Sequence, residues 1–196
     1  APSAAFANGP QARAMDMGDV HEEAGHLGEY ILPSLLAAAE MRAGRGQPVS
    51  GREFIEAYAV GGEVLARTGN SAFAISANRT HHQGRHCQFG WIGAAAAVAK
   101  LLGLNYEQTW HALGIAYVTA SCFDGQMYLE GSLMCRGHHA QVCRDAVTSA
   151  LLAEKGISGT KKIFTGNPCN FYSLYFPAKN DIKRLTDGLG SFWEFA

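Results

Sequence analysis

The segment from Phe89 to Leu102 constrains the fold most, because it is rich in Ala and nearly apolar on every side. Its one charged residue is Lys100. Ala is the strongest helix former, and a helix that is apolar all round must be buried among other elements. The chain has 196 residues, enough for one domain with a sizeable core. We therefore predict an all-α domain with this helix near its centre.

Two further helices are predicted in the first half of the chain. Residues 32–41 are rich in Ala and Leu, and Pro33 is tolerated in a first helical turn. Ser50 to Glu53 form a capping-box sequence, so a helix is expected from there to about Arg67 or Thr68. Residues 1–29 show little periodicity and contain several glycines, which predicts a loop-rich segment.

Two helices are predicted in the second half. Asn105 is a suitable N-cap for a helix that continues to about Ser121. Another helix is expected over residues 138–155, because Gly156 is a typical stop signal. The polar stretches 69–89 and 123–137 are predicted to be loops, and no segment alternates as a strand does.

Composition narrows the classes of partner and compartment. The formal net charge is −1 and no basic stripe is visible, which argues against nucleic acid because phosphates require clustered Lys and Arg. The longest apolar stretch is interrupted by Lys100, so no membrane partner is expected. No signal peptide is recognisable, and the five cysteines lack the spacing of a disulfide framework. We therefore expect a cytoplasmic protein.

Three polar clusters lie in predicted inter-helix loops. They combine carboxylate, imidazole and guanidinium groups, which suit acid–base catalysis and anion binding. Their members are Asp16, Asp19, His21 and His26; His81, His82, Arg85 and His86; and Arg136, His138 and His139. They predict one pocket for an anionic substrate, with solvated surface residues as the alternative.

A metal site is not predicted. His21 and His26 are five residues apart with Gly25 between them, whereas a zincin helix places two histidines four apart. The pairs Cys135 with His138 and His86 with Cys87 lack the paired Cys-x-x-Cys spacing of a zinc site. A metal-dependent hydrolase that uses these histidines is nevertheless kept as a third hypothesis.

Several segments together resemble the MmgE/PrpD (2-methylcitrate dehydratase) family. The resemblance extends from about Ala5 to Trp193, and residues 111–116 (HALGIA) are its most specific part. Its other segments are Ala7-Asn8-Gly9 with Met15-Asp16, Leu32 to Ala37, Gly62-Glu63-Val64 with Arg67, Gly90 to Ala97, Leu101 to Leu104, and Glu107 to Thr109.

The resemblance implies a large helical domain followed by a smaller α+β lid, usually in a homodimer. It also implies cofactor-free reactions on small polycarboxylates, such as dehydration, decarboxylation or epimerisation. By family standards, residues 1–188 would be the helical core without its first helices, and residues 189–196 would begin a truncated or separately encoded lid. A homo- or hetero-oligomer with a lid-bearing chain is therefore expected.

The resemblance also assigns candidate catalytic residues. Asp16 and His26 match family active-site positions, and His26 follows Asp16 by ten residues. A further family histidine has no unambiguous counterpart, because His82 and His86 lie on either side of its expected place. Val20 stands where the family has Thr. The catalytic residues expected are Asp16, His26, His82 and His86.

The expected substrate-binding residues are Arg85, Cys135, Arg136 and His138. Arg136 and His138 keep the family pattern, but Cys135 occupies the position of an active-site Lys. The first functional hypothesis is a lyase or isomerase that acts on a small di- or tricarboxylate. The second is a non-catalytic or scaffold subunit, with Cys135 as the mark of a lost site.

Overall fold

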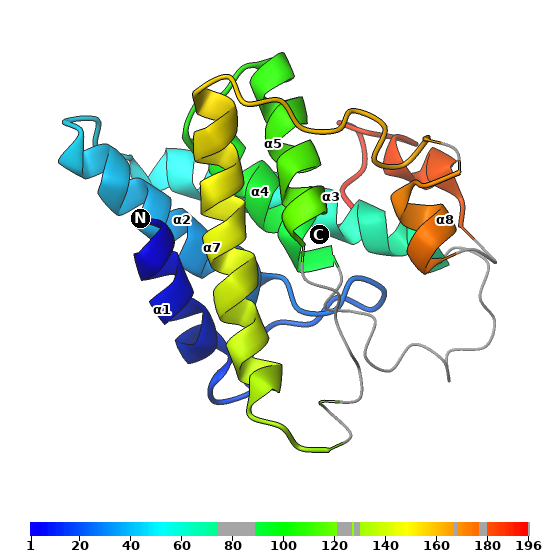
Figure 1. The fold of residues 1–196 in the computed structure, drawn as a ribbon, viewed down its shortest axis with the longest axis horizontal. Helices are drawn as coiled ribbons and strands as arrows, with labels where there is room; N and C mark the ends of the chain where they lie inside the picture. The colour runs from blue at the N-terminus through cyan, green and yellow to red at the C-terminus, as the bar shows by residue number, and fades with distance from the viewer. Residues whose placement is uncertain (74–88, 121–126, 128–129, 167, 177–179, 196) are drawn as a thin grey trace.

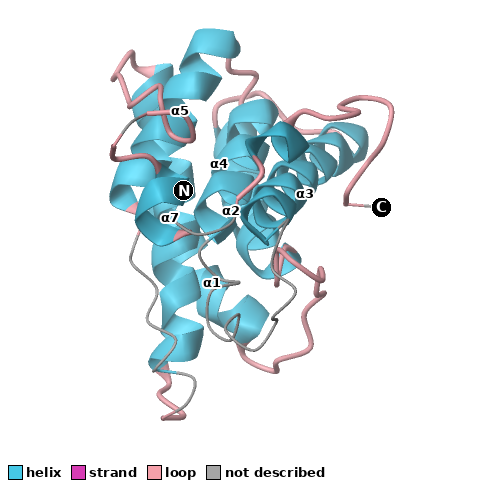
Figure 2. Cartoon of the chain, turned by 90° about the vertical axis from the view of Figure 1, so that its right-hand side faces the viewer, coloured by secondary structure: helices cyan, strands magenta, loops and turns pink. Residues whose placement is uncertain are grey.

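The structure is a computed structural model that describes residues 1–73, 89–120, 127, 130–166, 168–176 and 180–195. Over these residues the secondary structure is helical, and no strand is present in them (Figure 2). The helices are α1 (Pro2–Arg13), α2 (Gly28–Gly44), α3 (Gly51–Phe73), α4 (Gly90–Leu101), α5 (Tyr106–Thr119), α7 (Met134–Glu154), α8 (Phe171–Tyr175) and the 3-10 helix η3 (Ile182–Leu185). The all-α prediction is confirmed.

Helix α4 is the central element, as its sequence predicts. It contacts α2, α3, α5 and α7, and every residue from Gly90 to Leu101 except Lys100 is buried (Figure 1). Lys100 lies in the last turn, where its charge reaches solvent and favours the negative end of the helix dipole. The burial of this segment, which the sequence predicts, makes α4 the element around which α2, α3, α5 and α7 pack.

Small residues allow α3 and α4 to pack closely. A methyl group added at Gly61 would lie 2.7 Å from the backbone oxygen of Gly93 and from Cβ of Ala97. A methyl group at Gly93 would lie 2.7 Å from Cβ of Leu65. Side chains at these two glycines would force the helices apart, because interiors pack too densely to absorb the added volume.

The capping signals are confirmed. The Asn105 side chain accepts a hydrogen bond from the backbone N–H of Gln108 at 2.9 Å, and the Gln108 side chain accepts one from the backbone N–H of Asn105 at 3.1 Å. Ser50 and Glu53 make the same reciprocal pair at the start of α3. Each cap satisfies backbone N–H groups that have no partner within the helix.

The loop prediction for residues 1–29 is wrong over Pro2–Arg13, which forms α1. Gly9 and Pro10 lie inside this helix and disfavour it locally, so the sequence does not predict it. Packing against α7 overrides this preference. A methyl group at Gly9 would lie 2.7 Å from the backbone oxygen of His139 on α7, so only glycine permits this approach.

Three predicted helix boundaries also change. Helix α2 begins at Gly28 rather than Leu32, so Pro33 lies inside the helix instead of in its first turn. Helix α3 continues to Phe73, beyond the expected end near Thr68. Helix α7 begins at Met134 rather than at residue 138, so residues 134–137 belong to the helix and not to the predicted loop before it.

The segment after α8 is held against α3 by a buried ion pair. Nε of Arg67 lies 2.5 Å from Oε1 of Glu63, and both side chains are buried. The guanidinium also donates to the backbone oxygens of Arg184, Asp187 and Phe192, while Glu63 accepts from the backbone of Phe195. The domain boundary expected after residue 188 stays a prediction.

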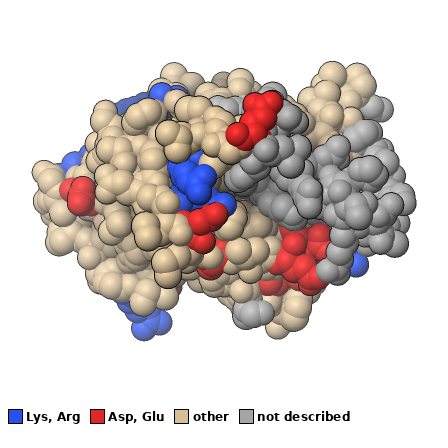
Figure 3. Space-filling view, turned by 90° about the horizontal axis from the view of Figure 1, so that it is seen from below, with Lys and Arg blue, Asp and Glu red and all other residues tan. Residues whose placement is uncertain are grey.

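The described helices include none that combines the length and apolar character needed to cross a membrane. The end of the molecule that carries the start of α7 faces the viewer in Figure 3. On that face, the described acidic and basic side chains form small groups on a largely uncharged surface.

Candidate active site

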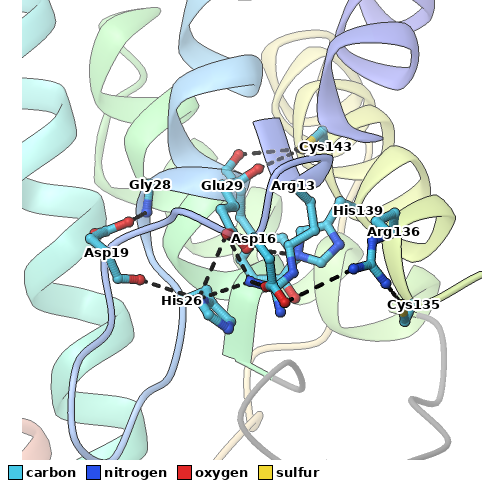
Figure 4. A network of polar contacts seen from close by, with 11 residues as sticks. Arg13, Asp16, Asp19, His26, Gly28, Glu29, Cys135, Arg136, His139 and Cys143 are labelled. Atoms are coloured by element: carbon cyan, nitrogen blue, oxygen red, sulfur yellow. Dashed lines mark hydrogen bonds and ion pairs between the residues drawn. The ribbon is translucent and has the colours of Figure 1, made fainter. Parts of the chain in front are cut away.

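The candidate site lies where the loop of residues 14–27 meets the first turns of α2 and α7. Figure 4 shows Arg13, Asp16, His26 and Glu29 pointing toward one another in this region. Arg13 ends α1 and Glu29 lies in the first turn of α2. Residues from two separate helices and the intervening loop therefore form one polar cluster, next to side chains of α7.

Arg13 is the buried cation of the cluster. Its Nη1 atom donates to Oε1 of Glu29 at 2.9 Å and lies 2.6 Å from Oδ1 of Asp16. Glu29 is almost fully buried, whereas the side chain of Asp16 is 54% exposed. Arg13 thus links a buried carboxylate to one that reaches the surface, and this pairing offsets the large cost of burying a charge.

Glu29 is ionised at neutral pH despite its burial. Burial alone would raise the pKa of this carboxyl group, but its contacts with His139 and Arg13, together with the nearby His26, outweigh that effect and lower the pKa. The Oε2 atom lies 3.2 Å from Nε2 of the fully buried His139. The carboxylate therefore supplies a fixed negative charge beneath the loop.

His26 borders this buried charge and reaches the surface, with 20% of its side chain exposed. Its Nδ1 atom lies 3.2 Å from the backbone oxygen of Asp19, 3.3 Å from Nη1 of Arg13 and 3.7 Å from Oε1 of Glu29. Within the part of the chain that the structure describes, Nε2 of His26 makes no hydrogen bond or ion pair. One ring nitrogen is therefore held by the protein, and the other can meet a substrate.

Asp16 and Arg136 form the exposed side of the cluster. Asp16 has a φ of 55°, a left-handed conformation that Asp tolerates better than most residues. Its Oδ2 atom lies 3.9 Å from Nη2 of Arg136, whose side chain is 37% exposed. Nη1 of Arg136 donates to Sγ of Cys135 at 2.6 Å. Cys135 is buried, so Arg136 is the member of this pair that can reach an anion.

Aromatic packing fixes the histidines of α7. The rings of His139 and Tyr30 are stacked, with 4.4 Å between their centroids and 8° between their planes. His138 is also buried and meets the Tyr30 ring edge-on at 6.4 Å. These rings form the rigid wall against which Glu29 lies.

The loop that carries Asp16 and His26 is anchored at several points. Asp19 accepts a hydrogen bond from the backbone of Gly28 at 2.9 Å, and the Tyr58 hydroxyl donates to Asp19 at 3.4 Å. Burial and the neighbouring Asp19 carboxylate raise the pKa of Tyr58 to about 12, so it remains a neutral donor. His21 accepts from the backbones of Glu23 and Ala24, which gives it a structural role in the turn.

Gly18 allows the loop to lie directly on Glu29. A methyl group at this position would overlap the Glu29 carboxylate and lie 2.6 Å from its Cδ. Because Glu29 is buried and held by Arg13 and His139, it has little room to move aside. Glycine at position 18 therefore sets the depth at which the loop covers the buried charge.

The structure brings some of the predicted site residues together. Asp16, His26, Cys135 and Arg136 lie in or beside one cluster. His138 lies deeper, against Tyr30. The remaining candidates, His82, Arg85 and His86, lie outside the described residues. The residue roles stay predictions.

Two central members of the cluster, Arg13 and Glu29, were not predicted. They are sixteen residues apart on different helices, so no local motif joins them. The available signal was an ionisable residue beside the apolar residues Tyr30 and Ile31, since buried charges require partners. Within the described residues, no group of three or more His, Cys, Asp or Glu side chains could hold a metal ion.

Fold and site together define an all-α domain with a buried ionic cluster that opens to the surface at a His, an Asp and an Arg. Residues 1–182 match the MmgE/PrpD N-terminal domain. The chain therefore belongs to the MmgE/PrpD family, which confirms the resemblance found in the sequence.

Relatives match nearly the whole chain. It is 34% identical to the cis-aconitate decarboxylase-like protein oryM of Aspergillus oryzae, over 98% of this chain and 41% of that protein. It is 31% identical to the cis-aconitate decarboxylase of Aspergillus terreus, over 97% of this chain and 40% of that enzyme. The Homo sapiens cis-aconitate decarboxylase is 32% identical, over 89% of this chain and 36% of that enzyme. The chain thus spans about two fifths of the length of these relatives.

Proposed function

We propose that this chain provides the helical catalytic domain of a lyase that decarboxylates cis-aconitate or a closely related unsaturated tricarboxylate. The observation that carries the proposal is that His26, Asp16 and Arg136 belong to one polar cluster and are each partly exposed, in a chain that resembles cis-aconitate decarboxylases over almost its whole length. The chemistry requires no cofactor, because the substrate's own carboxylates can stabilise the charge that develops.

The reaction breaks one C–C bond and releases a carboxylate as CO₂. The bonding electrons pass into the remaining unsaturated dicarboxylate, and one proton must then be added to carbon. His26 is the proposed proton donor, because imidazole exchanges protons near neutral pH and one of its ring nitrogens is available. Asp16 holds Arg13 and lies beside Arg136, so it orders the charges around this step.

Arg136 is the proposed anchor for a substrate carboxylate. A guanidinium presents a planar fork of donors that matches a carboxylate in two hydrogen bonds. Its side chain is partly exposed, whereas Arg13 is buried and already paired with two carboxylates. The more exposed cation binds the substrate, and the buried one supports the site.

Carbon dioxide release from cis-aconitate tests the proposal, with proton NMR of the organic product. We expect conversion by the native protein and a large loss in a His26→Gln variant that retains the wild-type circular dichroism spectrum. Equal turnover by the native protein and the His26→Gln variant would contradict the role of His26.

We also propose that the active unit contains a second copy of this chain or a lid-bearing chain. Large apolar side chains lie exposed in the loop that carries Asp16 and at the start of α7: Met15, Met17, Val20 and Leu133 are each more than 60% exposed. Exposed apolar groups of this kind favour association. Light scattering that finds a monomer with full activity would contradict this proposal.

A scaffold role without catalysis is the second candidate, and Cys135 favours it. In place of the family's Lys, this position holds a buried thiol that accepts a hydrogen bond from Arg136. A thiol supplies neither the fixed cation nor the three donors of an ammonium group. If the unmodified protein has no activity and the Cys135→Lys variant gains it, the scaffold role is supported. If the unmodified protein decarboxylates cis-aconitate, the scaffold role is excluded.

A further inference from the structure

We propose that residues 192–195, in the segment that follows η3, position the loop of residues 14–27, and that His21 is the positioning residue that joins the two. The contacts that carry this proposal involve no substrate. Its consequence for catalysis rests on the proposed lyase function, because the same loop carries Asp16 and His26.

The first step concerns the ring of His21, which joins backbone groups of two distant segments. The backbone N–H groups of Glu23 and Ala24 both donate to Nδ1, each at 3.2 Å. Nε2 lies 3.1 Å from the backbone oxygen of Glu194, which can only accept. A neutral ring with its proton on Nε2 satisfies all three contacts, and the other neutral tautomer satisfies none of them. The loop therefore donates through His21 to Glu194.

The second step concerns the turn that holds His21, which is fixed on α3. Backbone hydrogen bonds join His21 and Gly25 in both directions, at 2.8 and 3.0 Å. Ala24 lies inside this turn and is fully buried. A methyl group added at Gly69 of α3 would lie only 2.7 Å from Cα of Ala24, so the turn rests directly on the helix backbone. A turn packed this closely has one position, and His21 shares it.

The third step concerns residues 192–195, which are fixed on the same helix. The Glu194 carboxylate accepts a hydrogen bond from the Asn70 side chain at 2.5 Å. The backbone N–H of Phe195 donates to Oε2 of Glu63 at 3.0 Å. Both Asn70 and Glu63 are buried side chains of α3. The segment therefore offers the His21 ring an acceptor whose place is set by the helix.

A second contact joins the same segment to another part of the loop. The Phe195 ring meets the Tyr58 ring edge-on, with 5.8 Å between their centroids. The Tyr58 hydroxyl donates to the Asp19 carboxylate at 3.4 Å. The backbone oxygen of Asp19 lies 3.2 Å from Nδ1 of His26 (Figure 4). Residues 192–195 thus support the loop at two points, one of which lies next to His26.

Nitrogen NMR of the chain, labelled at histidine, tests the His21 ring without any substrate. At about pH 8, where an ordinary histidine is neutral, long-range proton–nitrogen correlations separate protonated from unprotonated ring nitrogens. The spectrum of a His21→Asn variant identifies the His21 signals among the eight histidines. We expect a proton on Nε2 and none on Nδ1. The reverse pattern would overturn the proposal.

Amide hydrogen exchange then tests the coupling between the two segments. His21→Asn keeps the turn, because the Asn oxygen can accept from the same backbone N–H groups, but its shorter side chain does not reach Glu194. The amides of Gly28 and Phe195 report the effect, since their hydrogen bonds do not involve the His21 ring. We expect both to exchange roughly 2–10-fold faster, as for the loss of one hydrogen bond. Phe195→Ala should speed exchange at Gly28 from the opposite end.

His111→Asn is the matched control. Nδ1 of His111 also accepts from a backbone N–H group, that of Gly159 at 3.2 Å, but this contact joins α5 to a segment far from the loop in sequence. Exchange at Gly28 should therefore stay as in the wild type. Wild-type exchange at Gly28 in either folded variant, His21→Asn or Phe195→Ala, would refute the positioning role, and so would an equal change in the control.

Kinetics separate this proposal from the proposed function. If the chain is a decarboxylase, His21→Asn should lower kcat with little change in KM, because the loop carries His26 whereas the proposed anchor Arg136 lies on α7. The loss should be smaller than that of His26→Gln, and an unchanged kcat would contradict the catalytic consequence. If the wild-type chain does not decarboxylate, hydrogen exchange still decides whether residues 192–195 position the loop, so the two proposals fail independently.

Discussion

The buried pair of Arg13 and Glu29 should dominate the local stability of the domain. Arg13→Met leaves a carboxylate that is 2% exposed, and Glu29→Leu leaves a guanidinium that is 6% exposed. Breaking a buried ion pair costs about 3–5 kcal/mol, because the remaining charge lacks its partner. Each remaining group here keeps other polar contacts, among them Glu29 with His139 and Arg13 with Asp16, so a loss at the lower end of this range, about 3 kcal/mol, is expected.

A double-mutant cycle by urea and thermal unfolding measures this effect. For a domain of this size, about 3 kcal/mol corresponds to a fall in Tm of about 6–12 °C. The double variant Arg13→Met/Glu29→Leu removes both charges, so its loss of unfolding free energy should be clearly smaller than the sum of the single losses.

The surface pair of Arg52 and Glu56 provides the control. Its atoms are also 2.9 Å apart, but the Arg52 side chain is 88% exposed. Arg52→Met should cost about 0.5 kcal/mol or less, since exposed pairs contribute little. If the Arg13 and Glu29 variants cost no more than this control, or their effects simply add, the reasoning from burial is wrong.

The remaining predictions concern catalysis, pH and packing. His26→Gln should lower kcat by roughly 10²–10⁴-fold in steady-state assays, with an unchanged Tm. Arg136→Gln should raise KM for the tricarboxylate more than it lowers kcat, and an unchanged KM would exclude it as an anchor. The pKa of Glu29 is lowered in the folded protein from its ordinary value of 4.5. The ionised carboxylate therefore stabilises the fold fully above about pH 4.5, and this stabilisation is lost as the pH falls through the lower pKa of the folded state. Acid unfolding of the Glu29→Gln variant should show a weaker pH dependence. Gly93→Ala should lower the unfolding free energy by about 1–3 kcal/mol, because its methyl group meets Leu65 at 2.7 Å.

The sequence predicts those parts of the fold that local physics decides. The central helix α4 follows from an Ala-rich segment with one charge, and the starts of α3 and α5 follow from their capping boxes. Helix α1 could not be predicted in this way. Gly9 and Pro10 oppose a helix locally, and the contact that reverses this preference is made with α7, far along the chain.

The residues of the candidate site likewise include some that the sequence predicts and others that it does not. Asp16, His26 and Arg136 stand out because their residue types suit acid–base chemistry and anion binding, and because the family resemblance singles them out. Arg13 and Glu29 carry no such signal, since their importance arises from burial and from a contact between two helices. A charge has this importance only in a low-dielectric position, which a sequence pattern does not specify.

The fit of Gly18 over the Glu29 carboxylate has an evolutionary consequence. A side chain at position 18 has no space while Glu29 is present, and loss of Glu29 leaves a hollow beneath the loop. The two positions should therefore covary, with glycine at 18 whenever a long acidic residue stands at 29, and larger residues at 18 permitted only with a small residue at 29. A combinatorial library randomised at both sites would recover these coupled pairs. A substitution at one of the two positions would be tolerated only together with a matching substitution at the other.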